Sequence, residues 1–281
     1  GDRVEGHIYP AHIAGDILDL DKYFLAREWP TPRSKVDLET YSYDRDPSNP
    51  QLRFPQPDLA VFTLKSFNPD NFPLLQALLQ KNAEKLRSTP NWIIDLRGNE
   101  GGDVRCGRLL LPYLYSGPIK QYNARKRVTR ANVQQWWNEY IADYYASLDS
   151  AGKLTYDAYR ADLLAHEGEL YDPDTAAYEM FMQDSMMSDP HHVAILIDAD
   201  CVSSGELFVM EARQSSKVTV MGRNSGGMID YGDVLHYSMP CSGVKLQLPF
   251  TRFNWLDEGV HVDDGGLKPD VELKSADQLR E

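Results

Sequence analysis

Apolar and polar positions in the first half of the chain alternate between two patterns. Runs of apolar, largely β-branched and aromatic residues at 58–67 and 91–98 predict strands, and the segments that follow them, 71–87 and 106–115, have the spacing of helices. Strands that alternate with helices favour a mostly parallel, buried sheet. We therefore predict an α/β domain that begins near residue 58.

The same alternation returns in the second half of the chain. A strand is predicted at 191–197, then a helix, then a strand at 217–223, and a strand-rich end at 234–255. Between the two halves, residues 125–187 have helical spacing and many Trp and Tyr residues, without a strand pattern. The sequence therefore predicts one α/β core domain that is interrupted by a helical insertion.

The chain before the core has a different composition. Residues 30–58 are rich in proline and polar side chains, which suits loops and short edge strands, with an edge hairpin as one arrangement. We expect two parts: an N-terminal segment at 1–57, and a core domain at 58–281 that contains the insertion.

Composition and charge exclude several classes of function. The chain has 281 residues and a net charge of −13, which argues against nucleic acid as a partner. No apolar run reaches the roughly 18 residues of a membrane span, and no signal segment opens the chain. The sequence has no HExxH motif, EF-hand or Cys/His cluster, so we predict no metal and no cofactor. Three cysteines leave the redox compartment open: Cys106, Cys201 and Cys241.

The stretch DADCVSSGE at 198–206 joins a predicted strand to a predicted helix through a short polar turn. This turn places Ser203 and Ser204 at the helix start, where backbone N–H groups lack partners and the helix dipole favours negative charge. A serine there suits a nucleophile whose oxyanion is bound by those groups. Serine is also a preferred N-cap residue, so two serines that only cap the helix are the alternative.

A second turn, in IIDLRGNEGGDV at 93–104, contains closely spaced glycines after a strand. Gly101 and Gly102 allow close backbone approach and can present N–H donors, as an oxyanion hole requires. The spacing does not fit a dinucleotide fingerprint, and a plain strand-to-helix turn is the alternative. Asp95 and Arg97 are expected to form a structural ion pair or to cap this loop.

Four stretches carry a family resemblance in their order along the chain: IIDLRGNEGG, CVSSGE, VMGRNSGG and GGLKPDVEL, over roughly residues 58–273. Together they resemble the C-terminal processing peptidases, also called tail-specific proteases. The resemblance implies a ClpP/crotonase-like β-α superhelical core. It also implies that the nucleophile is the serine three residues before Glu206, which is Ser203. The implied oxyanion donors are the N–H of Ser204 and one N–H of the Gly101–Gly102 turn.

The general base is the point at which the chain departs from part of the family. The Ser-Lys branch has a lysine 25 residues after the nucleophile, where this chain has Met228, and a thioether cannot accept a proton near neutral pH. The chain is more similar to the tricorn-like branch, whose base is a histidine before the core. VEGHIYP at 4–10 matches that stretch and implies His7. His12 is the nearest rival, and others lie in the insertion and at a strand entrance: His166, His191 and His192.

The resemblance also implies a third catalytic residue. Tricorn-like relatives have a glutamate three residues before the glycine of the closing G-x-x-P-D motif, and here that position is Asp263. Glu258 and Asp264 are the rivals, and turn residues without catalytic role are the alternative for both aspartates. Glu206 lies about one helical turn past the nucleophile, where we expect it to support the nucleophile turn or the glycine loop.

The function implied is a serine endopeptidase that acts on peptides or proteins, in the cell envelope or outside the cytoplasm. Two other classes remain open, a binding module of the same fold whose aromatic insertion holds an apolar ligand or peptide, and a degenerate peptidase that serves as a scaffold. We expect the insertion to border the active-site cleft and limit access. Residues 8–57 are too few for the PDZ domain that commonly precedes the core in tricorn-like members.

Overall fold

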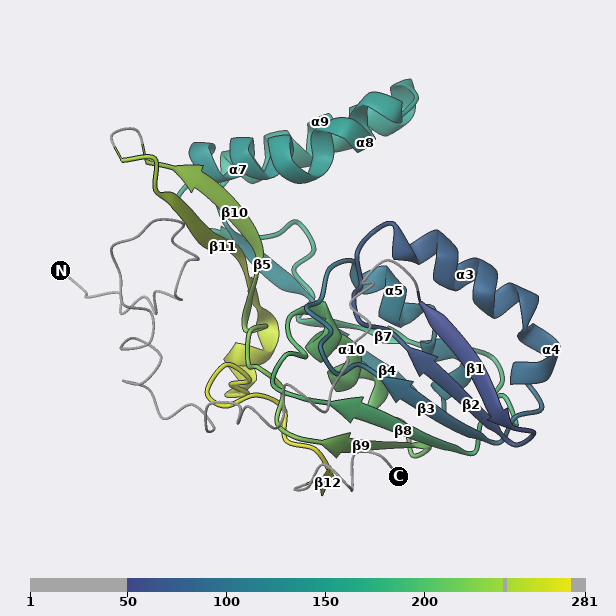
Figure 1. Cartoon of the computed structure of the whole chain (residues 1–281). Coiled ribbons are helices and arrows are strands. Elements are labelled where there is room, and N and C mark those ends of the chain that lie inside the picture. Colours follow the sequence, from purple (N-terminus) through teal and green to yellow (C-terminus); the bar gives the residue numbers. More distant parts are fainter. Residues whose placement is uncertain (1–49, 240–241, 274–281) are drawn as a thin grey trace. The chain divides into compact units, whose positions relative to one another are not determined.

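The computed structural model describes residues 50–239 and 242–273 (Figure 1). Contacts within the chain divide these residues into two compact units. The core unit comprises 50–123, 176–230 and 253–273, and the insertion unit comprises 124–175, 231–239 and 242–252. His7 and His12, together with Cys241, lie outside the described residues.

The core unit is built on a six-stranded sheet in the order β1-β2-β3-β8-β9-β12. The edge strand β1 is antiparallel to β2, and all other neighbours are parallel. The strands are β1 (Gln51–Gln56), β2 (Leu59–Thr63), β3 (Asn91–Asp95), β8 (His192–Ile197), β9 (Val218–Gly222) and β12 (Val271–Glu272). The predicted α/β class with a mostly parallel sheet is confirmed. A hairpin lies at its edge, but it pairs β1 with the first predicted core strand, β2, and does not lie within residues 30–58.

One row of side chains runs across four strands and forms the centre of the hydrophobic core. Phe62 pairs with Ile94, Ile94 with Ile195, and Ile195 with Val220. All four are fully buried. Burial of each such side chain contributes about 2 kcal/mol to folding, so this row strongly stabilises the parallel register.

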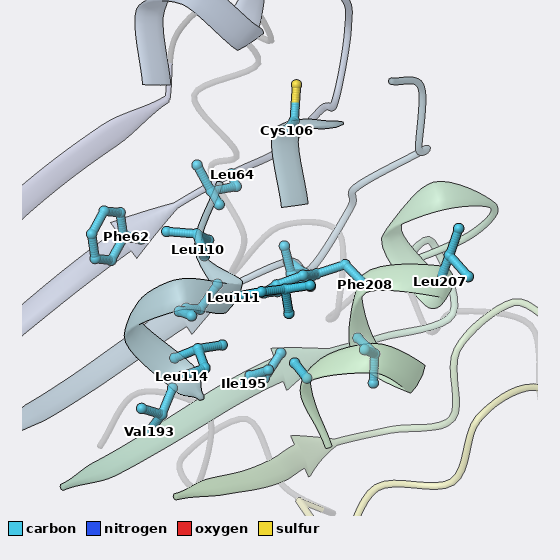
Figure 2. Close-up of a cluster of buried hydrophobic side chains, with 14 of the residues drawn as sticks. Phe62, Leu64, Cys106, Leu110, Leu111, Leu114, Val193, Ile195, Leu207 and Phe208 are labelled. Carbon is cyan, nitrogen blue, oxygen red and sulfur yellow. The ribbon is translucent and has the colours of Figure 1, made fainter. Parts of the chain in front are cut away.

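Helices cover the face of the sheet that carries this row. They are α3 (Asn71–Lys81), α4 (Ala83–Leu86), α5 (Val104–Arg108), α6 (Leu111–Leu114) and α10 (Ser204–Ala212). Figure 2 shows side chains of β2 and β8 on one side of this cluster, with Leu110, Leu111, Leu114 and Phe208 from the helical segments packed against them. The side chain of Asp103 starts α5 because it accepts a hydrogen bond from the N–H of Arg105.

The opposite face of the sheet is less buried than we predicted. Val61, Ile93 and Ala194 alternate with the core row and are only half-buried. Side chains of a strand point to the two faces in turn, so a strand pattern with apolar residues on both faces does not reveal that only one face is fully covered.

The carboxyl ends of the central strands lie at one edge of the sheet. Because β3, β8 and β9 are parallel, the loops that follow them, 98–102, 198–203 and 223–228, start at the same edge. Two of these loops contain the glycine motifs, and the third contains Ser203. The fold therefore brings three of the four sequence motifs together.

A small two-stranded sheet completes the core unit. Its strands β4 (Ile119–Tyr122) and β7 (Tyr178–Phe181) are antiparallel, and a short helix η2 (Asn254–Glu258) packs beside them through contact of Trp255 with Tyr122. Residues of β7 fall in the segment that we predicted as purely helical. That prediction was wrong for β7 and for two other short strands of the segment, Ala124–Arg127 and Leu170–Tyr171, all of which are too short to show their period.

The insertion unit combines helices with a four-stranded sheet, in the order β10-β11-β5-β6. Its elements are β5 (Ala124–Arg127), α7 (Arg130–Trp136), η1 (Trp137–Ile141), α8 (Ala142–Ser147), α9 (Ser150–Ala165), β6 (Leu170–Tyr171), β10 (Tyr231–Ser238) and β11 (Lys245–Phe253), of which Phe253 falls in the core unit. The strand-rich end of the sequence thus pairs with the insertion, whereas we predicted that it would continue the core.

The aromatic residues of the insertion unit form its own hydrophobic core. Trp136 and Trp137 are each 8% exposed, and Trp136 packs against Tyr159 and Phe250 with ring centres 6.0 Å apart in both cases. These side chains pack against one another. Such packing is the alternative to the apolar ligand pocket that the aromatic residues of the insertion suggested. Thr129 caps α7 by accepting a hydrogen bond from the N–H of Asn132.

None of the helices in the described part of the chain is long and apolar enough to cross a membrane.

Candidate active site

Ser203 occupies a strained position at the start of α10. Its backbone angles are φ 56° and ψ −128°, and among the described residues only Asp233 is another non-glycine residue with positive φ. Such angles cost about 1–3 kcal/mol and persist where the surrounding structure holds them, often at functional sites. The side chain of Ser203 is partly exposed, whereas Ser204 is buried. Only the first serine is therefore accessible to a substrate.

The glycine loop after β3 lies directly against this turn. A Cβ atom on Gly101 would lie 2.7 Å from the Cβ of Ser203, so no larger residue fits there without a shift. Gly101 also has a φ of 83°, which favours glycine. The close approach that we predicted for this glycine pair is therefore observed at Gly101.

The two glycines differ in where their N–H groups point. The N–H of Gly101 donates to Asn99 Oδ1 at 2.8 Å. Gly102 forms a parallel bridge with Phe67, in which Phe67 bonds to the residues on either side of Gly102. In such a ladder the N–H of the bridged residue faces away from its partner. Of the two glycines, Gly102 is therefore the one whose N–H points away from Phe67 and can be donated to another group.

Asn99 is a residue of the site that the sequence analysis did not single out. It is fully buried, and its side chain donates to the carbonyl oxygen of Leu64 at 2.8 Å while accepting from Gly101. Its own carbonyl oxygen accepts from the N–H of Val202 at 3.0 Å. Asn99 thus ties the glycine loop to the nucleophile turn. Its position between two glycines is the only sequence signal that could have identified it.

Ser204 is the first residue of α10, and its side chain is 6% exposed. Its N–H belongs to the first turn of the helix, where backbone donors have no partner within the helix. Its Oγ is buried and has no hydrogen-bond partner among the described residues. The helix start therefore combines an accessible hydroxyl on Ser203 with a backbone donor on the next residue.

Glu206 joins the nucleophile turn to the second glycine loop. Its fully buried carboxylate accepts four hydrogen bonds. They come from Ser203 N (3.1 Å), Met228 N (2.9 Å), Gly227 N (2.8 Å) and Ser225 Oγ (2.5 Å). Burial raises the pKa of this carboxyl above its ordinary value, although the four hydrogen bonds act in the opposite direction. The supporting role that we expected for Glu206 is confirmed.

Met228 lies in this second glycine loop with its side chain 49% exposed. Its contact with Glu206 is made by the backbone N–H. A thioether is only a weak acceptor and carries no titratable proton. The loop position that bears a lysine in one branch of the family therefore supplies no general base here.

Asp263 is fixed beside the same glycine loop by a reciprocal arrangement with Asp230. Asp263 Oδ1 accepts hydrogen bonds from the N–H groups of Ile229 (2.7 Å) and Asp230 (3.0 Å). In return, the buried Asp230 carboxylate accepts from the N–H groups of Val262 (3.1 Å) and Asp263 (3.0 Å). These hydrogen bonds give the Asp263 side chain a defined orientation and tie residues 262–263 to residues 229–230.

The rivals of Asp263 are differently placed. The Glu258 carboxylate accepts a hydrogen bond from the hydroxyl of Tyr122 at 2.6 Å and lies 3.4 Å from the Lys120 ammonium. The side chain of Asp264 is exposed. A Cβ atom on Gly227 would lie 3.3 Å from the Cα of Asp263, so Asp263 adjoins the loop that Glu206 joins to Ser203.

The histidines of the described residues separate into groups. His191 and His192 precede or begin β8, at the end of the strand opposite to Ser203, about 20 Å away along six residues of strand. His166 stacks on Tyr171 within the insertion unit, and His236 contacts Glu139 there. His261, which the sequence analysis did not weigh, is exposed and precedes Asp263 by two residues.

The described cysteines are not candidate nucleophiles. Cys106 and Cys201 are both fully buried. Burial raises the pKa of the Cys106 thiol to about 11 and raises that of Cys201 well above its usual range. Both thiols remain protonated near neutral pH, and a protonated thiol is a poor nucleophile.

The ion pair that we expected between Asp95 and Arg97 is present. The Arg97 guanidinium donates to both carboxylate oxygens of Asp95 at 2.8 Å, and the Lys65 ammonium lies 3.3 Å from Asp95. Burial acts to raise the pKa of the Asp95 carboxyl, but the hydrogen bonds and charges of Arg97 and Lys65 outweigh it and hold the pKa below its ordinary value. This cluster stabilises the start of the glycine loop.

Asp95→Asn is expected to lower the free energy of unfolding by about 3 kcal/mol at pH 7, because the partly buried cations Lys65 and Arg97 lose the carboxylate that both contact. A carboxyl whose pKa is lower in the folded than in the unfolded protein stabilises the folded state at pH values above its unfolded pKa, which is near 3.8 here. That contribution is lost as the pH falls through the pKa of the folded protein. Urea unfolding of both proteins should therefore show a difference that shrinks below pH 3.8. A difference that stays constant there would contradict this account.

Residues 58–273 match the model of peptidase family S41. The chain belongs to this family. It is the family that the four ordered motifs predicted, so that prediction is confirmed. A search of curated proteins found no significant match.

Two of the solved structures that this chain resembles, aligned with TM-scores of 0.52 and 0.50, share its fold. A putative peptidase from Parabacteroides merdae aligns with a TM-score of 0.52 and 13% identity, over 87% of this chain and 64% of that one. Mature CPAF complexed with lactacystin aligns with a TM-score of 0.50 and 16% identity, over 76% and 47%. The photosystem II D1 C-terminal processing protease aligns at 0.44 and 15%, over 77% and 42%. The S41 chain thus spans less than two thirds of the length of each of these proteins.

Proposed function

We propose that this S41 chain is a serine endopeptidase that hydrolyses peptide bonds through an acyl-enzyme on Ser203. The observation that carries the proposal is the geometry of the nucleophile turn. Ser203 combines strained backbone angles and an accessible side chain with a glycine loop pressed against it, at the start of a helix. This combination is typical of a nucleophile that must project from a tight turn toward an oxyanion site.

The oxyanion formed in each tetrahedral intermediate would be bound by two backbone donors. One is the N–H of Ser204, which lies in the unpaired first turn of α10. The other is the N–H of Gly102, because that of Gly101 is already donated to Asn99. Removal of one such donor typically lowers kcat by about 100- to 1000-fold.

We assign the general base to His7. The serine hydroxyl is a weak nucleophile until a neighbouring base takes its proton, and Met228 cannot do so. In the reaction His7 would accept the Ser203 proton as the hydroxyl attacks the peptide carbonyl, and would then donate it to the leaving amine. The same imidazole would next activate a water molecule, which releases the acyl group and regenerates Ser203.

Asp263 would orient that imidazole. Two backbone N–H groups fix its Oδ1, and the carboxylate held in this orientation would accept the hydrogen bond of the imidazole Nδ1–H. Aspartate is one methylene shorter than the glutamate of tricorn-like relatives. The Asp230 carboxylate, which is anchored by the Trp255 indole at 2.7 Å, places the backbone of Asp263 and thereby sets its reach.

Substitution of the candidate bases tests the assignment of His7. His7→Gln is expected to lower kcat for hydrolysis of a casein-derived peptide mixture by about 1000-fold or more, because the Ser203 proton then has no acceptor. His12→Gln and His261→Gln are the matched controls and should keep activity within a few-fold of wild type. A His7→Gln enzyme with normal activity would reject this base, and loss of activity in His261→Gln alone would move the role to that residue.

Asp263→Asn is expected to lower kcat by about 10⁴-fold in a folded protein, because an amide favours the wrong imidazole tautomer. Glu258→Gln is the control, since its contacts are with Tyr122 and Lys120, and it should retain nearly full activity. Near-normal hydrolysis by Asp263→Asn would remove this residue from the mechanism and leave a Ser-His dyad, or Glu258, as the remaining accounts.

The second candidate is a non-catalytic binding module of the same fold. The aromatic side chains that suggested it are packed against one another in the insertion unit, which disfavours a ligand pocket formed by them. Hydrolysis that depends on Ser203 would exclude a binding module and a degenerate scaffold together.

Three wider assignments belong to the same proposal. The substrate is a peptide or protein. Residues 1–57 form an N-terminal segment that supplies the base to a core domain at 58–281. The enzyme acts in the cell envelope or outside the cytoplasm, and fractionation of cells that produce the natural protein would locate it.

A further inference from the structure

A methionine-rich segment follows β7 on the surface of the core unit. Four of the eight methionines in the sequence lie within eight residues, and we refer to Met180, Met182, Met186 and Met187 as the thioether cluster. Met182 is 66% exposed, Met186 59% and Met180 44%. Methionine is usually buried and fills gaps in cores, so packing does not account for three thioethers in solvent.

The strand sets the direction of the first member. Phe181 packs against the ring of Tyr115 at 5.9 Å and belongs to the border of the core. Side chains of a strand alternate between faces, so Met180 points to the other side, and Met182 is the first residue after the strand ends at Phe181. Lys120, the cross-strand partner of Met180, extends toward the Tyr178 ring at 4.2 Å, away from Met182.

The chain after the strand is anchored at two points of one helix. The side chain of Gln183 donates to the carbonyl oxygen of Pro112 at 2.8 Å. The Lys217 ammonium donates to the carbonyl oxygens of Met187 (2.9 Å) and Tyr113 (3.3 Å). Pro112 and Tyr113 are consecutive residues of α6. Both ends of the loop 183–187 are therefore held against the same turn of this helix.

Between these anchors the chain bends at residues 184 and 185. Only this bend lies between Met182 and Met186. Each methionine side chain has three rotatable bonds, so its sulfur can move toward the neighbouring sulfurs. Asp184 is exposed between Met182 and Met186 and places a negative charge at this bend. The fold thus gathers flexible soft donors and negative charge in one place.

We propose that the thioether cluster binds one Cu(I) ion, with Met182 and Met186 as its principal ligands and Met180 or Met187 completing the site. Thioether sulfur is a soft ligand that selects Cu(I) over Zn²⁺, Mg²⁺ or Ca²⁺. The described residues contain no group of three His, Cys, Asp or Glu side chains that could hold a metal ion. The site is separate from the proposed active site and does not depend on peptidase activity.

The test is an anaerobic titration of the whole protein with Cu(I) in competition with bicinchoninate, a chromophoric Cu(I) chelator. The wild type should withdraw one equivalent of Cu(I). Met182→Leu/Met186→Leu should raise the apparent dissociation constant at least tenfold, because leucine keeps the volume but removes the sulfur donor. Met239→Leu is the control, since Met239 is 44% exposed and lies outside the cluster, and it should bind as the wild type does. Circular dichroism of each variant establishes that it is folded.

Two outcomes would overturn the proposal. The first is a wild type that withdraws no Cu(I), or a double variant that binds as tightly as the wild type. The second is binding that weakens tenfold or more between pH 7 and pH 5, after correction for the chelator. Thioethers do not titrate in that range, whereas imidazole in general does, so such a loss would assign the copper to ligands other than the thioether cluster.

Discussion

Ser203→Ala should lower kcat for peptide hydrolysis by about 10⁶-fold while the protein remains folded. The size of the effect follows from the role of the nucleophile, whose removal leaves only the rate enhancement from the oxyanion donors and substrate binding. Alanine keeps the Cβ that packs against Gly101 and changes no hydrogen bond of the Ser203 backbone N–H. It removes the capping contact between the Ser203 side chain and the backbone of Glu206, which costs about 1 kcal/mol, so circular dichroism of the variant is the control that separates lost chemistry from misfolding.

Ser204→Ala separates the two serines. It removes a buried hydroxyl that has no hydrogen-bond partner among the described residues, but leaves the N–H that we assign to the oxyanion hole. We expect activity within about tenfold of wild type and an unchanged or slightly higher unfolding temperature. If Ser204→Ala were inactive and Ser203→Ala active, the assignment of the nucleophile would be reversed.

Glu206→Gln is expected to lower both the free energy of unfolding, by about 2 kcal/mol or more, and kcat, by at least about 100-fold. All four partners of Glu206 donate to it, two to each carboxylate oxygen. The amide NH₂ of glutamine cannot accept, so in either orientation at least one buried backbone N–H loses its partner. The turn that carries Ser203 then loses its fixed position, and an error of about 1 Å there lowers the rate by about 100-fold.

Glu211→Gln is a matched control for that experiment. Glu211 is also a buried glutamate of α10, but its partner is the Arg108 guanidinium at 2.7 Å and not a loop of the candidate site. This variant should be destabilised by a similar amount, yet retain near-normal kcat in the folded fraction. Equal losses of kcat in the two variants would mean that Glu206 acts only through general stability.

The sequence predicted the elements whose periods are long enough to be read. The core row of Phe62, Ile94, Ile195 and Val220 comes from strands that stand out as short apolar runs, and a serine begins the helix that follows Ser203's turn. The strands β5, β6 and β7 were missed because they have only two to four residues. Their pairing is set by tertiary contacts rather than by local pattern.

The same distinction holds for the candidate site. Ser203, the glycine pair and Glu206 lie in ordered motifs, so sequence could point to them. Asn99 was missed because a single buried asparagine in a loop has no pattern of its own. The exchange of hydrogen bonds between Asp230 and Asp263 could not be predicted either, because more than thirty residues separate its two halves. His7, on which the mechanism depends, lies outside the described residues.

The most direct test of the central claim is labelling with a fluorophosphonate probe, followed by mass spectrometry of the labelled peptide. Our account predicts one label per chain, located on Ser203, lost in Ser203→Ala and retained in Ser204→Ala. A folded wild-type protein that is not labelled, or a label that persists on another residue in Ser203→Ala, would contradict it.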